Sequence, residues 1–268
     1  METLKEKLKD FERKINENTR EDKLQEFFEE LAPAFLYGGY IQVRNDYRVY
    51  IKTIEFYFHS ETNGIKDPIV YHRNNNCIEC VEVEEEIPYF PLMSLHAHPS
   101  GYDITFESTS NHYRASVLIR AYEVKSVDKN NKDDKDVYLI WDTKKEMFVK
   151  QEKYCFNTQS TYLYALLNGF NIISSEDYKD KVIWEDDIKD KRFEKDDIKL
   201  NIRKNVPLFR PEGNDYVKIT KDFYINNKEY VEKLHPVLKK VKPNFFVSGK
   251  ETCLRDPKLW QFNRVTEI

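Results

Sequence analysis

The sequence predicts one α+β domain, built from a curved, mostly antiparallel sheet with flanking helices. Two amphipathic segments at the N-terminus have apolar residues at helical spacing. They precede many short segments rich in Tyr, Val, Ile and Phe, the residue types that favour strands. Helices that flank such strands, instead of alternating with them, are typical of the α+β class. At 268 residues, the chain is long enough to bury a core without disulfides or metal ions.

Two helices are expected at the N-terminus. The first spans about Glu2–Asn16 and the second about Asp22–Phe35. Asp22 is the expected N-cap, Pro33 is expected to kink or shorten the last turn, and the Gly38-Gly39 pair ends the helix. The apolar stripes of the two helices are formed by Leu4, Leu8, Phe11, Ile15, Leu24, Phe27, Phe28, Leu31 and Phe35.

Strands account for most of the remaining chain. They are expected over Tyr40–Arg44, Arg48–Phe58, Cys80–Ile87, Leu92–His98, Tyr102–Glu107, Ser116–Val124 and Val137–Trp141. The first two form a hairpin across the Asn45-Asp46 turn, and the fourth and fifth pair with each other. A further helix is expected over Thr158–Asn168, the very charged segment Asp180–Asp196 is expected on the surface, and Pro243–Ile268 mixes short strands and loops.

Composition restricts the possible classes of function. Aromatic residues make up 14% of the chain and there are only 7 Gly, which favours strands and stacking surfaces over Gly-rich phosphate loops. The absence of a dinucleotide glycine pattern, a phosphate-loop lysine and a serine nucleophile elbow argues against dehydrogenases, nucleotide kinases and serine hydrolases. The net charge of −4 is not typical of a nonspecific nucleic-acid binder, although Asn201–Ile268 carries 14 basic against 8 acidic residues.

The sequence also predicts where the protein works. No apolar run approaches the length of a membrane span, and no signal peptide is recognised at the N-terminus. Four cysteines without a secretory signal indicate reduced thiols. We therefore expect a cytoplasmic monomer without membrane contact, in which a helical extension (residues 1–22) precedes the main domain (residues 23–268).

Glu55 is the first candidate for chemistry. Because strand residues alternate between faces, Thr53, Glu55, Tyr57 and His59 share one face, and Ile54, Phe56 and Phe58 share the other. If the Ile and Phe face is the core, Glu55 either faces water or lies in a cleft beside aromatic walls as a general base.

Three further groups of residues remain open to two interpretations each. Cys77 and Cys80, together with His96 and His98, are either a tetrahedral zinc set or ordinary loop and strand residues. Arg120, at the end of an apolar stretch, either makes a structural salt bridge or holds a phosphate or a water beside a carboxylate. His72 is either inert or a wall of a pocket.

The order of these segments resembles the methylpurine-DNA glycosylase family, which acts on alkyladenine and 3-methyladenine. In that family a helix with a Leu-Leu-Gly-like end is followed by a strand, a turn and a strand bearing Glu-Thr-Glu-Ala-Tyr. Here Leu31–Gly39 leads to a hairpin that ends with Thr53–Tyr57. Val117–Glu123 resembles the family's Leu-Leu-Arg-Ala-Leu-Glu-Pro strand, Ser160–Gly169 a later helix, and Asn244–Gly249 the closing strand.

The resemblance implies a DNA N-glycosylase of base excision repair that acts on a damaged purine flipped out of double-stranded DNA and needs no cofactor. Glu55 falls on the catalytic Glu, Arg120 on the Arg that helps to hold the attacking water, Tyr57 on a base-stacking Tyr and His72 on a pocket His. The chain departs from the family at Thr53, which replaces a Glu, and it has no clear counterpart of the hairpin that wedges into DNA. The alternatives are a glycosidase for free nucleosides, a non-catalytic protein that binds a nucleobase or another small ligand, and an interaction protein stabilised by zinc at Cys77, Cys80, His96 and His98.

Overall fold

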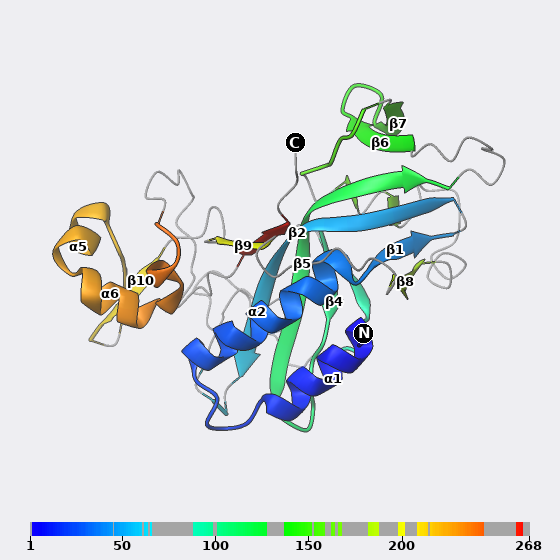
Figure 1. The fold of residues 1–268 in the computed structure, drawn as a ribbon. Coiled ribbons are helices and arrows are strands. Elements are labelled where there is room, and N and C mark those ends of the chain that lie inside the picture. Colours follow the sequence, from blue (N-terminus) through cyan, green and yellow to red (C-terminus); the bar gives the residue numbers. More distant parts are fainter. Residues whose placement is uncertain are drawn as a thin grey trace.

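The computed structural model is an α+β protein in which an antiparallel sheet curls into a half-barrel and a few helices flank it (Figure 1). The structure describes residues 2–44, 46–60, 62–63, 65, 88–98, 101–127, 137–151, 153–158, 162–163, 166–167, 182–187, 198–201, 208–213, 215–243 and 261–264. Within these residues, the predicted class and the antiparallel character of the sheet are confirmed.

The described helices are α1 (Leu4–Lys14), α2 (Glu21–Tyr37), α5 (Lys221–Asn226), α6 (Lys228–Leu234) and the 3-10 helix η2 (Pro236–Lys239). The described strands are β1 (Gly39–Val43), β2 (Tyr47–Ser60), β3 (Leu95–His98), β4 (Gly101–Thr105), β5 (Tyr113–Ser126), β6 (Val137–Asp142), β7 (Met147–Gln151), β8 (Val182–Asp186), β9 (Ile198–Asn201), β10 (Phe209–Glu212), β11 (Asp215–Lys218) and β12 (Gln261–Arg264). The main sheet has the order β3-β4-β5-β2-β1-β8; β12 also pairs with β2, β9 with β12, β6 with β5 and β7 with β6, while β10 and β11 form a separate hairpin.

The two longest strands, β2 and β5, form the centre of the sheet. Their antiparallel register is regular except at one point, where Lys52 of β2 and Arg120 of β5 have no Cα partner. Each strand therefore carries one extra residue, and the alternation of its side chains changes phase there. As a result, Ile51 before the irregularity and Ile54 after it both point into the core, and both are fully buried.

Helices α1 and α2 cover one face of β2 and β5 (Figure 1). The ring of Phe28 in α2 stacks on Phe56 of β2, with centroids 4.3 Å apart, and on Phe11 of α1, with centroids 5.7 Å apart. Burial of each such side chain contributes about 1.5–3 kcal/mol. The predicted division of β2 is confirmed, because Ile54, Phe56 and Phe58 belong to the core cluster under the helices.

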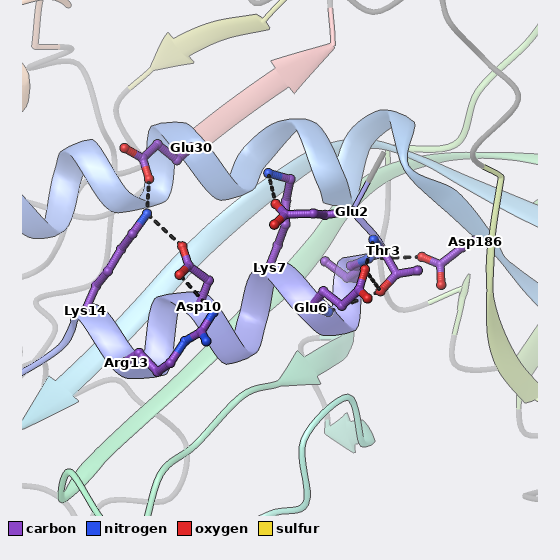
Figure 2. A network of polar contacts seen from close by, with 10 residues as sticks. Glu2, Thr3, Glu6, Lys7, Asp10, Arg13, Lys14, Glu30 and Asp186 are labelled. Carbon is purple, nitrogen blue, oxygen red and sulfur yellow. Dashed lines mark hydrogen bonds and ion pairs between the residues drawn. The ribbon is translucent and has the colours of Figure 1, made fainter.

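The start of α1 is held by a capping box and by contacts to neighbouring elements (Figure 2). The Glu6 N–H donates to Thr3 Oγ1 (3.2 Å), and the Thr3 N–H donates to Glu6 Oε2 (2.8 Å). Asp186 at the end of β8 accepts a hydrogen bond from a first-turn backbone N–H (3.0 Å), and Lys14 in the last turn pairs with Glu30 of α2 (2.7 Å). The apolar side chains of α1 belong to the same core as those of α2.

The expected N-cap of α2 is wrong, and of the two effects expected of Pro33 the shortening of the helix is wrong. The N-cap is Arg20, which makes no side-chain cap, while Asp22 lies inside the first turn, where the helix dipole favours a carboxylate. Pro33 does not shorten the helix, which continues to Tyr37. Proline removes one backbone hydrogen bond, and burial of the apolar residues that follow it offsets this loss.

The remaining predicted elements have mixed outcomes. The structure confirms the two predicted strand pairs: β1–β2 is the hairpin of Tyr40–Arg44 with Arg48–Phe58, and β3–β4 is the pair of Leu92–His98 with Tyr102–Glu107. Two more predicted strands are confirmed, because Ser116–Val124 lies within β5 and Val137–Trp141 lies within β6. The segment Asp180–Asp196, which was expected on the surface, contains the strand β8, and Trp184 of this strand packs against the core. Of the predicted helix Thr158–Asn168, residues 162–163 and 166–167 are described as helical and Thr158 is not, while Cys80–Ile87 lies outside the described residues. In the part of the chain that the structure describes, no helix has the length and apolar character needed to cross a membrane.

Candidate functional site

Glu55 lies near the middle of β2, on the face of the sheet opposite the helices. It is 1% exposed, so the interpretation that it simply faces water is wrong. Its Oε2 accepts a hydrogen bond from the Tyr57 hydroxyl at 3.0 Å and pairs with Nη2 of Arg120 at 2.8 Å. A buried carboxylate needs such partners, because removing an ion from water is costly.

Strand β5 brings Arg120 to Glu55. Leu118 is the Cα partner of Glu55, and Arg120 follows it by two residues, so it lies on the same face as a diagonal neighbour. Burial lowers the pKa of the Arg120 guanidinium, but the Glu55 carboxylate and the Tyr57 hydroxyl together raise it by more, so this pKa lies above its ordinary value. The Arg120 side chain is 33% exposed, so Arg120 is the member of the ion pair that contacts solvent.

The two carboxylate oxygens of Glu55 differ in their surroundings. Arg120 and Tyr57 both bind Oε2, whereas Oε1 is buried and accepts no hydrogen bond from any described residue. Arg120 supplies a positive charge beside Oε2, and the lone pairs of Oε1 can still accept a proton or a hydrogen bond. This arrangement is suited to a general base that takes a proton from a bound water or hydroxyl.

A second buried carboxylate, Asp103 of β4, lies on the same face. Leu118 is the Cα partner of Glu55 on one side and of Asp103 on the other, so two strand spacings, about 10 Å, separate the two acids. The Ser116 hydroxyl donates to Asp103 Oδ2 at 2.9 Å. The two carboxylates therefore do not share a site, and Asp103 offers a matched control for Glu55.

A buried ion pair on the same face was missed by the sequence analysis. Lys52 of β2 pairs with Glu123 of β5 at 2.7 Å, and Lys125 approaches the same carboxylate at 3.3 Å. The side chains of Lys52 and Glu123 are 8% and 4% exposed. The phase change at Lys52 turns these side chains away from the core. A signal was present in the sequence, because the apolar residues Ile51 and Ile54 are three positions apart.

A third polar cluster lies beyond Tyr57 on this face. Arg114, the Cα partner of His59, pairs with Glu107 at 3.1 Å and donates to the carbonyl of Pro88 at 3.2 Å. The same carboxylate oxygen of Glu107 accepts a hydrogen bond from the Phe90 N–H at 2.7 Å. These contacts attach residues 88–90 to the sheet.

Replacement of Glu107 by Gln is expected to change the pH dependence of stability. Burial raises the pKa of Glu107 above its ordinary 4.5, against the opposing effects of the Phe90 N–H and Arg114. A carboxyl group whose pKa is raised by folding contributes stability that is fully present below pH 4.5. This contribution is lost as the pH rises through the pKa of the group in the folded state. The free energy of unfolding of Glu107→Gln, relative to wild type, should therefore increase as the pH rises above 4.5, by at most about 1.4 kcal/mol per pH unit.

Urea unfolding over a series of pH values measures this difference. The pair Arg210–Glu212 provides the control, since the Glu212 side chain is 55% exposed. Glu212→Gln should show no such trend. A difference for Glu107→Gln that is independent of pH, or that decreases as the pH rises, would contradict the expectation.

Several predicted site residues are not brought into this site by the described structure. His72, Cys77 and Cys80 lie outside the described residues, so the pocket role of His72 and the zinc set stay predictions. His96 and His98 lie two residues apart on β3, and the His96 ring is 4.6 Å from that of Phe90. Among the described residues, no group of three or more His, Cys, Asp or Glu is placed to hold a metal ion.

Comparisons with known proteins give no relative. No protein-family model matches the chain, and no curated protein or solved structure matches it significantly.

Proposed function

We propose that this protein is a DNA N-glycosylase that hydrolyses the bond between deoxyribose and a damaged, alkylated purine, and that Glu55 is its general base. This proposal places the protein in base excision repair and gives it a fold of the methylpurine-DNA glycosylase type. The observation that supports it most is the buried Glu55 carboxylate with one oxygen paired to Arg120 and the other without a described donor.

The proposed reaction needs one carboxylate and one water. The water oxygen forms a bond to C1′ of the sugar as the bond from C1′ to the base nitrogen breaks, and the electron pair of that bond leaves with the base. Glu55 Oε1 takes a proton from the water. A purine alkylated at N3 or N7 carries a positive charge before cleavage and therefore leaves as a neutral base without an acid to protonate it.

The neighbours of Glu55 have complementary roles in this reaction. The sugar becomes positively charged in the transition state, so a nearby carboxylate stabilises it as well as accepting the proton. Arg120 pairs with Glu55 and, because its side chain is 33% exposed, reaches toward the sugar-phosphate and the attacking water. Tyr57, next to Glu55 on the same face, and His72 are the proposed walls around the base.

Hydrolysis of free nucleosides is the second candidate. It uses the same carboxylate and water but requires no contact with a phosphate backbone. The net charge of −4 favours this candidate, because duplex binding depends on concentrated positive charge.

The test is incubation of the purified chain with duplex DNA, single-stranded DNA and free nucleosides that contain an alkylated purine or hypoxanthine. Base release from DNA, detected as strand cleavage at the abasic site, is the expected result. Release from nucleosides alone would assign the second candidate. Binding of a damaged base without release from any of these substrates would overturn the proposed activity and favour a non-catalytic binding protein.

A further inference from the structure

A row of aromatic rings crosses the strands of the sheet on the face that carries Glu55. We call it the aromatic strip; its members are Tyr40 of β1, Tyr50 of β2, Tyr138 of β6, and Tyr154 and Phe156 in the segment after β7. The centroids of Tyr40 and Tyr50 are 5.3 Å apart, those of Tyr138 and Tyr154 are 5.4 Å apart, and those of Tyr154 and Phe156 are 6.3 Å apart. The strip thus joins elements from both sides of the β2–β5 pair.

Cationic side chains lie between the rings. Lys125 bridges the two halves of the strip, with Nζ 5.2 Å from the Tyr50 centroid and 5.3 Å from that of Tyr138. Arg48 lies 4.8 Å from the Tyr40 ring, and Lys52 lies 5.5 Å from the Tyr154 ring.

The strip has a local excess of positive charge. Among the described residues, Arg48, Lys52 and Lys125 carry three positive charges there, against the carboxylates of Glu123 and of Glu185, which is the Cα partner of Tyr40 on β8. Positive charge therefore exceeds negative charge at the strip, in a chain whose net charge is −4. Such a surface is complementary to a polyanion.

Packing within the sheet does not account for the whole strip. Tyr40, Tyr50 and Tyr138 are half-buried, but Tyr154 is 43% exposed and Phe156 is 41% exposed. Adjacent exposed rings beside cations provide flat surfaces for stacking and charges for phosphates. Single-stranded nucleic acid has both components, whereas the base faces of a duplex are already stacked on one another.

We propose that the aromatic strip binds single-stranded nucleic acid, with bases stacked on Tyr154 and Phe156 and phosphates held beside Lys125 and Arg48. The strip lies about 16 Å along β2 from Glu55, since Tyr50 precedes Glu55 by five residues of roughly 3.3 Å each. A strand on the strip therefore runs within a few nucleotides of the carboxylate. Binding there does not require Glu55 to act as a base.

The experiment measures the fluorescence anisotropy of a labelled oligothymidine of about 15 nucleotides, a length that covers a typical site for single strands. The double substitution of Tyr154→Ala and Phe156→Ala should weaken binding at least about tenfold. Tyr230→Ala is the matched control, because this ring on α6 is 46% exposed and lies outside the strip. It should bind the oligothymidine as tightly as wild type does.

Salt dependence tests the role of the cations. Loss of one phosphate contact in Lys125→Gln should reduce the slope of log affinity against log salt concentration by about 0.7. Equal affinities of the double variant and Tyr230→Ala for the oligothymidine would overturn the proposal. Because undamaged thymidine offers no alkylated base to release, these results are independent of whether the glycosylase proposal holds.

Discussion

Glu55→Gln is expected to lower the rate of base release by about 10²–10⁴-fold, the usual contribution of a positioned general base. Glutamine has nearly the same shape as glutamate, but its amide cannot accept the proton of the attacking water. It also removes the negative charge that faces the developing positive charge on the sugar. Arg120 loses its charged partner but keeps the Tyr57 hydroxyl beside it, and its side chain is 33% exposed and can be hydrated, so the fold should survive. Single-turnover base release and the urea unfolding midpoint measure the two effects.

Asp103→Asn is the control for this substitution. Asp103 is another buried carboxylate on the same face, about 10 Å from Glu55, and asparagine can still accept the hydrogen bond from Ser116. This variant should release the nucleobase at a rate within about threefold of that of wild type. Such a change is small compared with the effect of removing a positioned general base. Two outcomes contradict the assignment of Glu55: retention of activity in Glu55→Gln, and an equal loss in Asp103→Asn.

The face on which Glu55 lies could be predicted from the sequence, but its burial could not. Alternation along β2 separates Glu55 and Tyr57 from Phe56, and this separation is what the structure shows. Whether a polar face is exposed to solvent depends on which segments pack over it. Strand alternation carries no information on this packing. The interpretation in which Glu55 faces water therefore failed.

The meeting of Arg120 with Glu55 depends on long-range register. The sequence resemblance suggested that both residues serve one site, and the register of β2 with β5 brings them together. The irregularity at Lys52 and Arg120 was not predicted, although the three-residue spacing of Ile51 and Ile54 marks it in the sequence. The extra residue of a bulge in one strand can be recognised from the local sequence. The matching extra residue in the partner strand can be identified only when the pairing of the two strands is known.

The aromatic strip could not be predicted from sequence for a related reason. Its rings come from four elements, and no local pattern connects Tyr40 with Tyr154. The high aromatic content suggested stacking surfaces in general, and only the curled sheet decides which rings lie together.

Phe28→Ala is expected to lower the free energy of unfolding by about 3–5 kcal/mol, the usual cost of truncating a fully buried phenylalanine. The ring is completely buried between Phe11 and Phe56, so its removal leaves a cavity lined by two aromatic faces. A domain is typically stable by about 5–15 kcal/mol, and the variant should therefore still fold with a measurable unfolding transition in urea. Ile225→Ala, at a side chain that is 61% exposed, should change the same quantity by less than about 0.5 kcal/mol.

The same substitution tests how the helices position the site. Phe56 directly follows Glu55, so the stack of Phe28 on Phe56 joins α2 to the strand that carries the carboxylate. In a double-mutant cycle of Phe28→Ala with Phe56→Leu, the loss of the shared stack should give a coupling of at least about 0.5 kcal/mol, as expected for residues in contact. Additive effects would mean that the two rings only fill separate volumes. In that case α2 would stabilise the fold without fixing the position of Glu55.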